Sequence, residues 1–243
     1  MNIYSNSFFH RVREYSVVTQ ILQEGFKAFY CKEEIYRGKG VPPTSIGIPM
    51  VSFCDIPLSH ITKNNYGNCG IAMSRRWGIS HHLEPVLYYP NDTKCQSTKM
   101  IIAAADIFLQ DRDNNEAYRI LGYAKPVKKN LRIKGKSSDN YVEREWRKVY
   151  ANPSPLKWKT EAEYNIYRGD KAAPKQPVGT PLGFDINDID FILIDKSNLN
   201  NLCHFIMGEL NCIGGHLEHK LKDEDRYALL SKILVYENLV NNL

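Results

Sequence analysis

The sequence predicts an α+β fold in which helices flank a mixed, mostly antiparallel sheet. Short apolar runs rich in β-branched and aromatic residues recur along the chain, and such runs are typical of buried strands. Apolar stripes with helical spacing stand between some of these runs, but strands and helices do not alternate as they do in βαβ units. The length of 243 residues and the hydrophobic fraction of 43% are sufficient for a substantial core.

The N-terminal part of the chain begins with an expected strand and helix. Residues 7–10 contain two phenylalanines and are expected to form a short strand. Residues 15–24 place valine, isoleucine and leucine side chains on one helical stripe, and Gly25 directly after it is suited to end the helix. The next expected elements are strands at 26–30, 49–54 and 69–73, a loop at 36–47, helical turns at 75–79 and a strand at 85–89.

The second half of the chain is expected to contain a long apolar helix and further strands. Residues 99–110 favour a helix that extends to Leu121 after a polar interruption. Residues 141–150 and 189–194 are rich in β-branched and aromatic residues and are expected to be strands. The segment 151–181 is polar and rich in proline and lysine, which favours a long loop. Helices are expected at 197–210 and 223–240.

Residues 1–243 are expected to form one domain, with a core at 8–206 and a helical extension at 207–243, since the sequence shows no internal repeat or linker. The six cysteines lack CxxC spacing, which favours reduced thiols. No run reaches the ~20 apolar residues of a membrane span. The N-terminus lacks the pattern of a signal peptide. We therefore expect a cytoplasmic protein that does not insert into membranes.

Common catalytic and metal-binding motifs do not occur in the sequence. It contains no GxGxxG, P-loop, HExxH or GxSxG pattern. The grouping that most resembles a zinc site consists of Cys203, Cys212, His216 and His219. Its two cysteines are nine residues apart, whereas zinc ligands usually come in close pairs, so we expect no metal site. The mild net charge of +5 permits a nucleotide or nucleic acid as partner without requiring one.

The expected strand at 141–150 carries the most informative side chains. Successive side chains of a strand point to opposite faces, so Glu143, Glu145 and Arg147 would share one face. Two carboxylates on one face repel each other unless a cation or a ligand offsets their charge. Such carboxylates bind ribose hydroxyls or stabilise an oxocarbenium-like centre, and Arg147 could bind a phosphate of a nucleotide cofactor. The alternative is an exposed, ion-paired strand face without a further role.

A series of short segments follows one another in an order that carries a family resemblance. These segments are Phe9-His10, Ile21 to Phe26, Pro49 to Ser59, Tyr66 to Ile71, Trp77, Pro85 to Tyr88, Gly122 to Pro126, Glu143 to Arg147 and Asp188 to Ile192. In this combination the chain resembles the AbiGi family of bacterial abortive-infection proteins over about residues 8–206. The resemblance implies anti-phage defence as the antitoxin half of a toxin–antitoxin pair, with a cognate toxin or a phage or host macromolecule as partner.

A second resemblance comes from a strand with a histidine, the L-x-x-I-L-x-x-G-like helix after it, and a late strand with Glu-x-Glu. These features are similar to ADP-ribosyltransferase folds of the DarT-like kind. The resemblance implies an ADP-ribosyltransferase-like fold that binds NAD, with His10 as the ribose contact and Ser52 or Tyr66 as the middle element. Glu145 would then be the catalytic carboxylate, and Glu143 would orient the acceptor.

Three functions stay open on the sequence. The first is a phage-defence protein that binds NAD or a nucleotide and modifies a target, which requires His10 and Glu145 to converge on one cleft. The second is a non-enzymatic antitoxin or regulator that binds a protein or a nucleic acid. The third is an enzyme or binding protein that contacts nucleic acid through a basic run. This run consists of Lys125, Lys128, Lys129, Arg132, Lys134 and Lys136.

Overall fold

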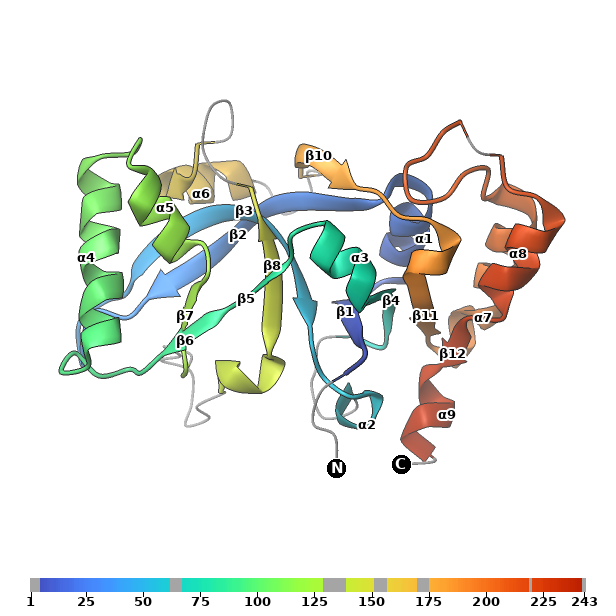
Figure 1. The fold of residues 1–243 in the computed structure, drawn as a ribbon, viewed down its shortest axis with the longest axis horizontal. Coiled ribbons are helices and arrows are strands. Elements are labelled where there is room, and N and C mark those ends of the chain that lie inside the picture. The colour runs from blue at the N-terminus through green and yellow to red at the C-terminus, as the bar shows by residue number, and fades with distance from the viewer. Residues whose placement is uncertain are drawn as a thin grey trace. The chain divides into compact units, whose positions relative to one another are not determined.

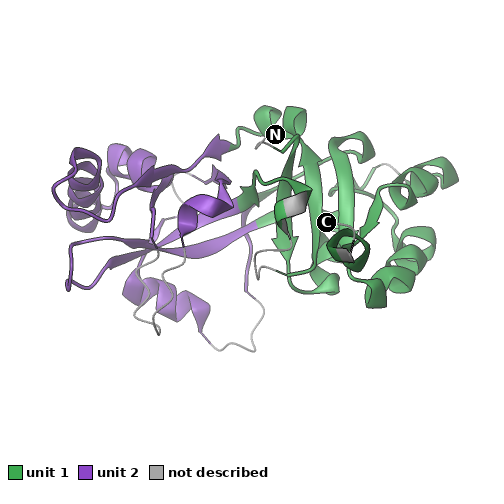
Figure 2. Cartoon of the chain, turned by 90° about the horizontal axis from the view of Figure 1, so that it is seen from below, with its two compact units in different colours: residues 1–27, 52–83, 180–243 green, residues 28–51, 84–179 purple. Residues whose placement is uncertain are grey.

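The chain forms two compact units, each built from separate stretches of sequence (Figure 2). The computed structural model describes residues 5–61, 67–128, 139–150, 157–169, 175–218 and 220–241. Unit 1 comprises residues 1–27, 52–83 and 180–243, and unit 2 comprises residues 28–51 and 84–179. The expected organisation as one domain with an extension at 207–243 stays a prediction.

The sheet of unit 1 consists mainly of antiparallel strands (Figure 1). Strand β1 (Ser7–Val12) pairs antiparallel with β4 (Cys69–Ser74), and β4 pairs antiparallel with β11 (Ile189–Ile194). The end of β3 (Thr44–Cys54) pairs with the other side of β1. Strand β12 (Ile233–Val235) joins β11 in parallel, so the sheet is mixed.

Helices pack against this sheet from both faces. Phe8 and Phe9 point to opposite faces of β1 because side chains alternate along a strand. Phe8 lies against Gly78 of α3 (Arg75–Ser80), where an added Cβ would come within 2.2 Å of its ring. Phe9 belongs to a buried cluster with Leu193, against which Leu239 of α9 (Tyr236–Asn241) packs. Unit 1 contains nine helical elements among its described residues. The helical elements are α1 (Tyr15–Glu24), α2 (Leu58–Ile61), α3 (Arg75–Ser80), η2 (Ile186–Asp188), η3 (Lys196–Asn198), α7 (Leu199–His204), the π-helical turn η4 (Phe205–Glu209), α8 (Asp223–Leu230) and α9 (Tyr236–Asn241).

Unit 2 contains a second set of strands, again mostly antiparallel. Most residues of β2 (Phe26–Ile35) and β3 belong to this unit and pair antiparallel, and β9 (Lys159–Thr160) extends the pairing on β3. Strand β8 (Glu145–Val149) pairs with β3 and antiparallel with β5 (Glu84–Pro85). The short strands β6 (Leu87–Tyr89) and β7 (Ala124–Pro126) form a separate parallel pair. Strand β10 (Val178–Leu182) runs from unit 2 into unit 1 along the chain.

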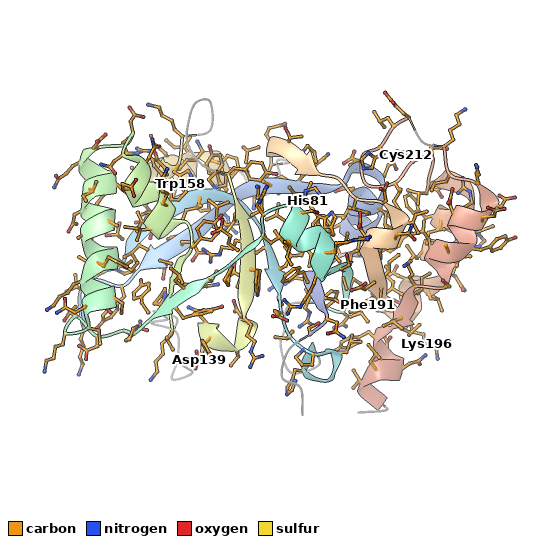
Figure 3. All side chains as sticks on the ribbon, in the orientation of Figure 1. His81, Asp139, Trp158, Phe191, Lys196 and Cys212 are labelled. Carbon is orange, nitrogen blue, oxygen red and sulfur yellow. The ribbon has the colours of Figure 1, made fainter. Side chains whose placement is uncertain are left out.

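The main buried cluster of unit 2 lies between these strands and the first two of its three helices. The helices are α4 (Gln96–Gln110), α5 (Asn115–Leu121) and α6 (Glu161–Arg168), and the 3₁₀ turn η1 (Asn140–Glu143) precedes β8. Trp158, labelled in Figure 3, is 1% exposed and packs edge-on against Tyr118 of α5 with ring centroids 4.4 Å apart. Ile48 of β3 and Phe108 of α4 belong to the same buried cluster.

The predicted α+β class with a mixed, mostly antiparallel sheet is confirmed. Helix α1 ends at Gly25 as predicted, with the glycine at a φ of 76° and its N–H bonded to the carbonyl of Ile21. The strands predicted at 7–10, 69–73 and 189–194 are also present. The finer prediction of an ADP-ribosyltransferase-like fold stays a prediction.

The strand predicted at 141–150 is wrong in its first part. Residues 140–143 form η1, and β8 begins only at Glu145. The side chain of Asp139 accepts a hydrogen bond from the backbone N–H of Tyr141 at 2.9 Å. Such a local bond offers the backbone an alternative to strand pairing. Arg144 then adopts a left-handed φ of 43°, which connects the turn to the strand.

Other expectations for secondary structure are also wrong. The loop expected at 36–47 is shorter, because β3 begins at Thr44 and pairs with β2. The long loop expected at 151–181 contains α6 where it is described, because Thr160 and Glu163 form a capping box. The helix expected to run on to Leu121 is divided, since Asn114 caps a separate helix α5. The helix expected at 223–240 is interrupted at β12, whose apolar, partly β-branched residues pair with β11. None of the described helices is both long and apolar enough to cross a bilayer.

Candidate functional site

The carboxylates singled out in the sequence lie in a buried cluster of charged side chains within unit 2. On β8, Glu145 and Arg147 are two residues apart and point to the same side of the strand. Glu145 is 7% exposed and Arg147 is 0% exposed. The alternative of an exposed, ion-paired strand face is therefore wrong for these residues. Charges buried this deeply persist only with hydrogen-bonded or oppositely charged partners.

Arg147 donates hydrogen bonds to two carboxylates and one carbonyl group. Its Nε lies 2.7 Å from Oε1 of Glu145, and its Nη2 lies 2.8 Å from Oε1 of Glu33 on β2. Its Nη1 donates to the carbonyl oxygen of Gly122 at 3.1 Å. The planar guanidinium holds several acceptors in fixed directions. Arg147 therefore ties β8 to β2 and to the end of α5.

Lys125 on β7 joins the two glutamates of the predicted site. Its Nζ lies 2.7 Å from Oε2 of Glu145 and 3.1 Å from Oε2 of Glu143. Glu143 reaches this position from the end of η1 and not from a strand, because the backbone turns at Arg144. The structure thus brings Glu143, Glu145 and Arg147 together, although through a local conformation that differs from the predicted strand.

Tyr88 on β6 holds the backbone where β8 begins. The N–H of Glu145 donates to Oη of Tyr88 at 2.9 Å. The ring of Tyr141 packs edge-on against the Tyr88 ring, with centroids 5.3 Å apart. Burial raises the pKa of Tyr88 above its usual range, so the hydroxyl stays protonated. This contact fixes the position from which Glu145 enters the cluster.

The charges of the cluster are nearly balanced. Its members are the carboxylates of Glu33, Glu143 and Glu145 and the cations Lys125 and Arg147. Burial acts to raise the pKa of Glu145, but Arg147 and Lys125 outweigh burial and hold that pKa well below its usual range. At Glu33 burial dominates, and its pKa is raised despite the attraction of Arg147. As the pH falls, Glu145 therefore stays ionised longer than Glu33, and Glu33 takes up a proton first.

The hydrogen bonds of the cluster connect secondary-structure elements, and they leave no carboxylate oxygen of Glu145 without a partner. Both carboxylate oxygens of Glu145 accept hydrogen bonds from Arg147, and Oε2 also accepts one from Lys125. A general base, or a carboxylate that stabilises an oxocarbenium-like centre, must instead contact the reacting atoms. The catalytic roles of Glu145 and Glu143 and the phosphate contact of Arg147 stay predictions.

Two of the predicted cofactor contacts, His10 and Ser52, meet within unit 1. Nδ1 of His10 lies 2.8 Å from the carbonyl oxygen of Ser52, so Ser52 contributes its backbone to this contact. The rings of Phe26 and Phe53 pack around the imidazole, with centroid distances of 5.3 and 5.5 Å. Burial lowers the pKa of His10, while the bond to Ser52 opposes this shift. The ring is therefore neutral at physiological pH, with Nδ1 as the donor. Its role as a ribose contact stays a prediction.

Other predicted residues are only partly covered by the structure. Tyr66 lies outside the described residues. So do Lys129, Arg132, Lys134 and Lys136 of the basic run. Lys125 of that run is held by the buried glutamates, and Lys128 is exposed. Within the described ranges, no group of three or more His, Cys, Asp or Glu side chains is placed to hold a metal ion. The predicted convergence of His10 and Glu145 stays a prediction.

The sequence did not indicate that Glu33 and Lys125 belong to the cluster. Glu33 lies two residues from the buried Ile35 on β2, so both point to the same side of the strand. A charged residue at such an inward position was the available signal. Lys125 lies between Ala124 and Pro126, both buried, and was assigned only to the basic run. No local pattern connects either residue to β8.

The cluster predicts opposite pH dependences for two glutamines introduced in it. The lowered pKa of Glu145 contributes stability above the unfolded-state value, and this contribution is lost as the pH falls below about 4.3. The raised pKa of Glu33 contributes stability below about pH 4.3, which is lost as the pH rises through the folded-state value. Urea unfolding at a series of pH values should therefore show the cost of Glu145→Gln shrinking towards acid. The loss in free energy of unfolding caused by Glu33→Gln should shrink towards neutral pH.

Glu116→Gln on the exposed side of α5 is the control, and parallel pH curves for all variants would contradict this prediction.

Comparison with known proteins gives one family and one relative. A family model described as "Putative abortive phage resistance protein AbiGi, antitoxin" matches residues 24–195. The chain is 26% identical over 231 residues to the abortive phage resistance protein AbiGi of Lactococcus lactis subsp. cremoris, covering 79% of this chain and 87% of the relative. No solved structure matches the chain. The family match includes all five members of the charged cluster, and it excludes His10.

Proposed function

Because the chain belongs to the AbiGi family of abortive phage resistance proteins, we propose that it acts in anti-phage defence as an antitoxin, by binding a cognate toxin protein and without catalysis of its own. The description of the family supports the antitoxin role, and an antitoxin implies a toxin as partner. In this proposal the charged cluster keeps unit 2 in the shape that the partner recognises.

The proposal that the protein is not an enzyme rests on the ion pairs that Glu145 forms inside the fold. Its two oxygens are engaged by Arg147 and Lys125, and its side chain is 8% exposed. A reaction at Glu145 would first have to separate two buried ion pairs, and breaking such pairs is strongly unfavourable. Binding of a partner protein does not require these ion pairs to separate, so the cluster can stay intact.

A second candidate is an NAD-dependent ADP-ribosyltransferase, and the contact between His10 and Ser52 favours it. These residues were predicted as ribose contact and middle element, and they meet in unit 1 next to the rings of Phe26 and Phe53. In this candidate Glu145 would stabilise the centre that forms as nicotinamide leaves.

One pair of assays separates the two candidates. The first co-produces the chain with its cognate toxin in a bacterial host and measures growth. We expect rescue by the parent, by His10→Ala and by Glu116→Gln, provided that circular dichroism shows each to be folded. The second incubates the purified chain with labelled NAD and a cell lysate, and we expect no transfer of label. Transfer by the parent that is lost in folded His10→Ala and Glu145→Gln variants would establish the enzyme and overturn our proposal.

A further inference from the structure

Helix α4 of unit 2 exposes apolar side chains on its outer side. A helix on the surface of a globular protein normally presents polar residues to solvent. Here Met100 is 49% exposed and Ile107 is 43% exposed, with the exposed Ala103 between them. In Figure 1 the helix lies at the edge of unit 2, and no other described element of this unit covers its outer side.

The exposed apolar residues form a stripe that is separate from the buried face. Met100, Ala103 and Ile107 follow the spacing i, i+3, i+7, which is the a–d–a pattern of a two-helix seam. The buried face is formed by other residues, among them Ile101 and Phe108. The stripe is therefore not needed for the core of unit 2. Its central residue is a small alanine, which lets a second helix approach closely.

The charges of α4 make this stripe complementary to a second copy of itself. Lys99 and Asp106 are the two charged residues among its 15 residues, and both lie along the same edge of the stripe. Asp106 pairs with Nη1 of Arg37 at 2.8 Å, yet its side chain remains 52% exposed. Lys99 is exposed and forms no ion pair with a described residue. In an antiparallel pair of helices, Lys99 of each copy lies opposite Asp106 of the other.

We propose that two copies of this chain associate through α4, as an antiparallel pair of helices around a two-fold axis near Ala103. The observation behind this inference is an exposed a–d–a stripe whose flanking charges are positive towards one end and negative towards the other. A two-fold axis brings unlike charges together twice, as a self-complementary interface requires. The inference is independent of the antitoxin proposal, because it requires neither a toxin nor a bound cofactor.

The size of the contact sets the expected strength of this dimer. A helix of 15 residues is about 22 Å long. Stable protein interfaces bury roughly 1,200–2,000 Å², and one pair of helices that meets through a stripe of three residues a side buries less than that. We therefore expect a reversible dimer with a dissociation constant on the order of micromolar. It should form and separate with protein concentration.

Sedimentation equilibrium of the full chain across the micromolar range is the first test. We expect the parent to shift from monomer to dimer, and Ala103→Glu to stay monomeric because it places a charge at the centre of the seam. Leu109→Glu is the matched control, since Leu109 is 47% exposed on the same helix but lies outside the stripe. A monomeric parent would overturn the inference, and so would an Ala103→Glu variant that dimerises like the parent. Equal loss of dimer in Leu109→Glu would also count against it.

A charge exchange between two variants gives the second test. In a dimer of Lys99→Glu alone, an acidic residue at position 99 would face Asp106 of the other copy twice. In a dimer of Asp106→Lys alone, two lysines would face each other twice. Mixed together, the two variants would form a heterodimer in which both pairs unite unlike charges. We expect each variant alone to dimerise more weakly than the parent and the mixture to regain the dimer. Circular dichroism confirms that Asp106→Lys folds without its contact to Arg37. If the mixture stays as monomeric as its components, the antiparallel arrangement is wrong.

Discussion

Replacing Arg147 with methionine is expected to lower the free energy of unfolding by about 3–5 kcal/mol. The guanidinium is fully buried and donates to Glu33, Glu145 and the carbonyl of Gly122. Methionine has a similar length but no donor, so Glu33 loses the arginine with which it pairs and Glu145 keeps only Lys125. A buried charge left without its partner costs far more than the pair contributed. Urea unfolding followed by circular dichroism measures the loss.

Two further variants show whether the loss comes from the ion pairs. Arg119→Met removes an arginine that is 75% exposed and paired with Glu116, and we expect little change. Arg147→Lys keeps the positive charge but cannot reach three acceptors at once, so an intermediate loss is expected. If Arg147→Met and Arg119→Met unfold at the same urea concentration, the cluster does not stabilise unit 2 in the way described.

Replacing Trp77 with alanine is expected to lower the free energy of unfolding of unit 1 by about 3–5 kcal/mol. Trp77 on α3 is 2% exposed, and its ring packs against Phe26 and Phe53 with centroid distances of 5.4 and 5.5 Å. Its Nε1 donates to the carbonyl oxygen of Gly183 at 2.9 Å. Alanine would leave a cavity and an unpaired carbonyl. The same two phenylalanines hold His10, so the imidazole would also lose its support.

The control for Trp77 comes from the same short helix. Ile79→Ala truncates a side chain that is 65% exposed, and we expect almost no change in stability. Trp77→Phe keeps a ring but loses the hydrogen bond to Gly183, so its loss should fall between the two. Thermal unfolding of the three variants gives the order. Comparable losses in Ile79→Ala and Trp77→Ala would show that the aromatic cluster is not the source of the effect.

The parts of the fold that the sequence predicted correctly are those with a strong local signal. The stripe at 15–24 followed by Gly25 gave α1 and its end, and the apolar run at 189–194 gave β11 with the same bounds. Two of the failures occurred where a polar side chain accepts hydrogen bonds from the backbone of the residues that follow it. Asp139 turned the start of the predicted strand into η1, and Asn114 divided a predicted helix. One or two local hydrogen bonds decide such boundaries, and the periodicity of apolar residues does not show them.

The candidate site shows a similar division. Glu143, Glu145 and Arg147 were predicted to share one strand face. Glu145 and Arg147 do so on β8, whereas Glu143 reaches the cluster from η1 and is joined to Glu145 through Lys125. The sequence did not show that they would be buried. Their burial is tolerated because Lys125 on β7 pairs with Glu145 and Glu33 on β2 pairs with Arg147. Only the packing of distant strands brings these partners to β8.

The segment from Glu143 to Arg147 thus separates what the sequence by itself determined from what the tertiary structure decided. The sequence determined the α+β class, the family and the presence of two carboxylates beside an arginine, because each depends on residue identity and local spacing. The tertiary structure decided that these charges face inward, that they pair with Lys125 and Glu33, and that the oxygens of Glu145 are already engaged. Electrostatic pairing depends on distances of a few ångströms between residues remote in sequence, and only the folded chain sets those distances.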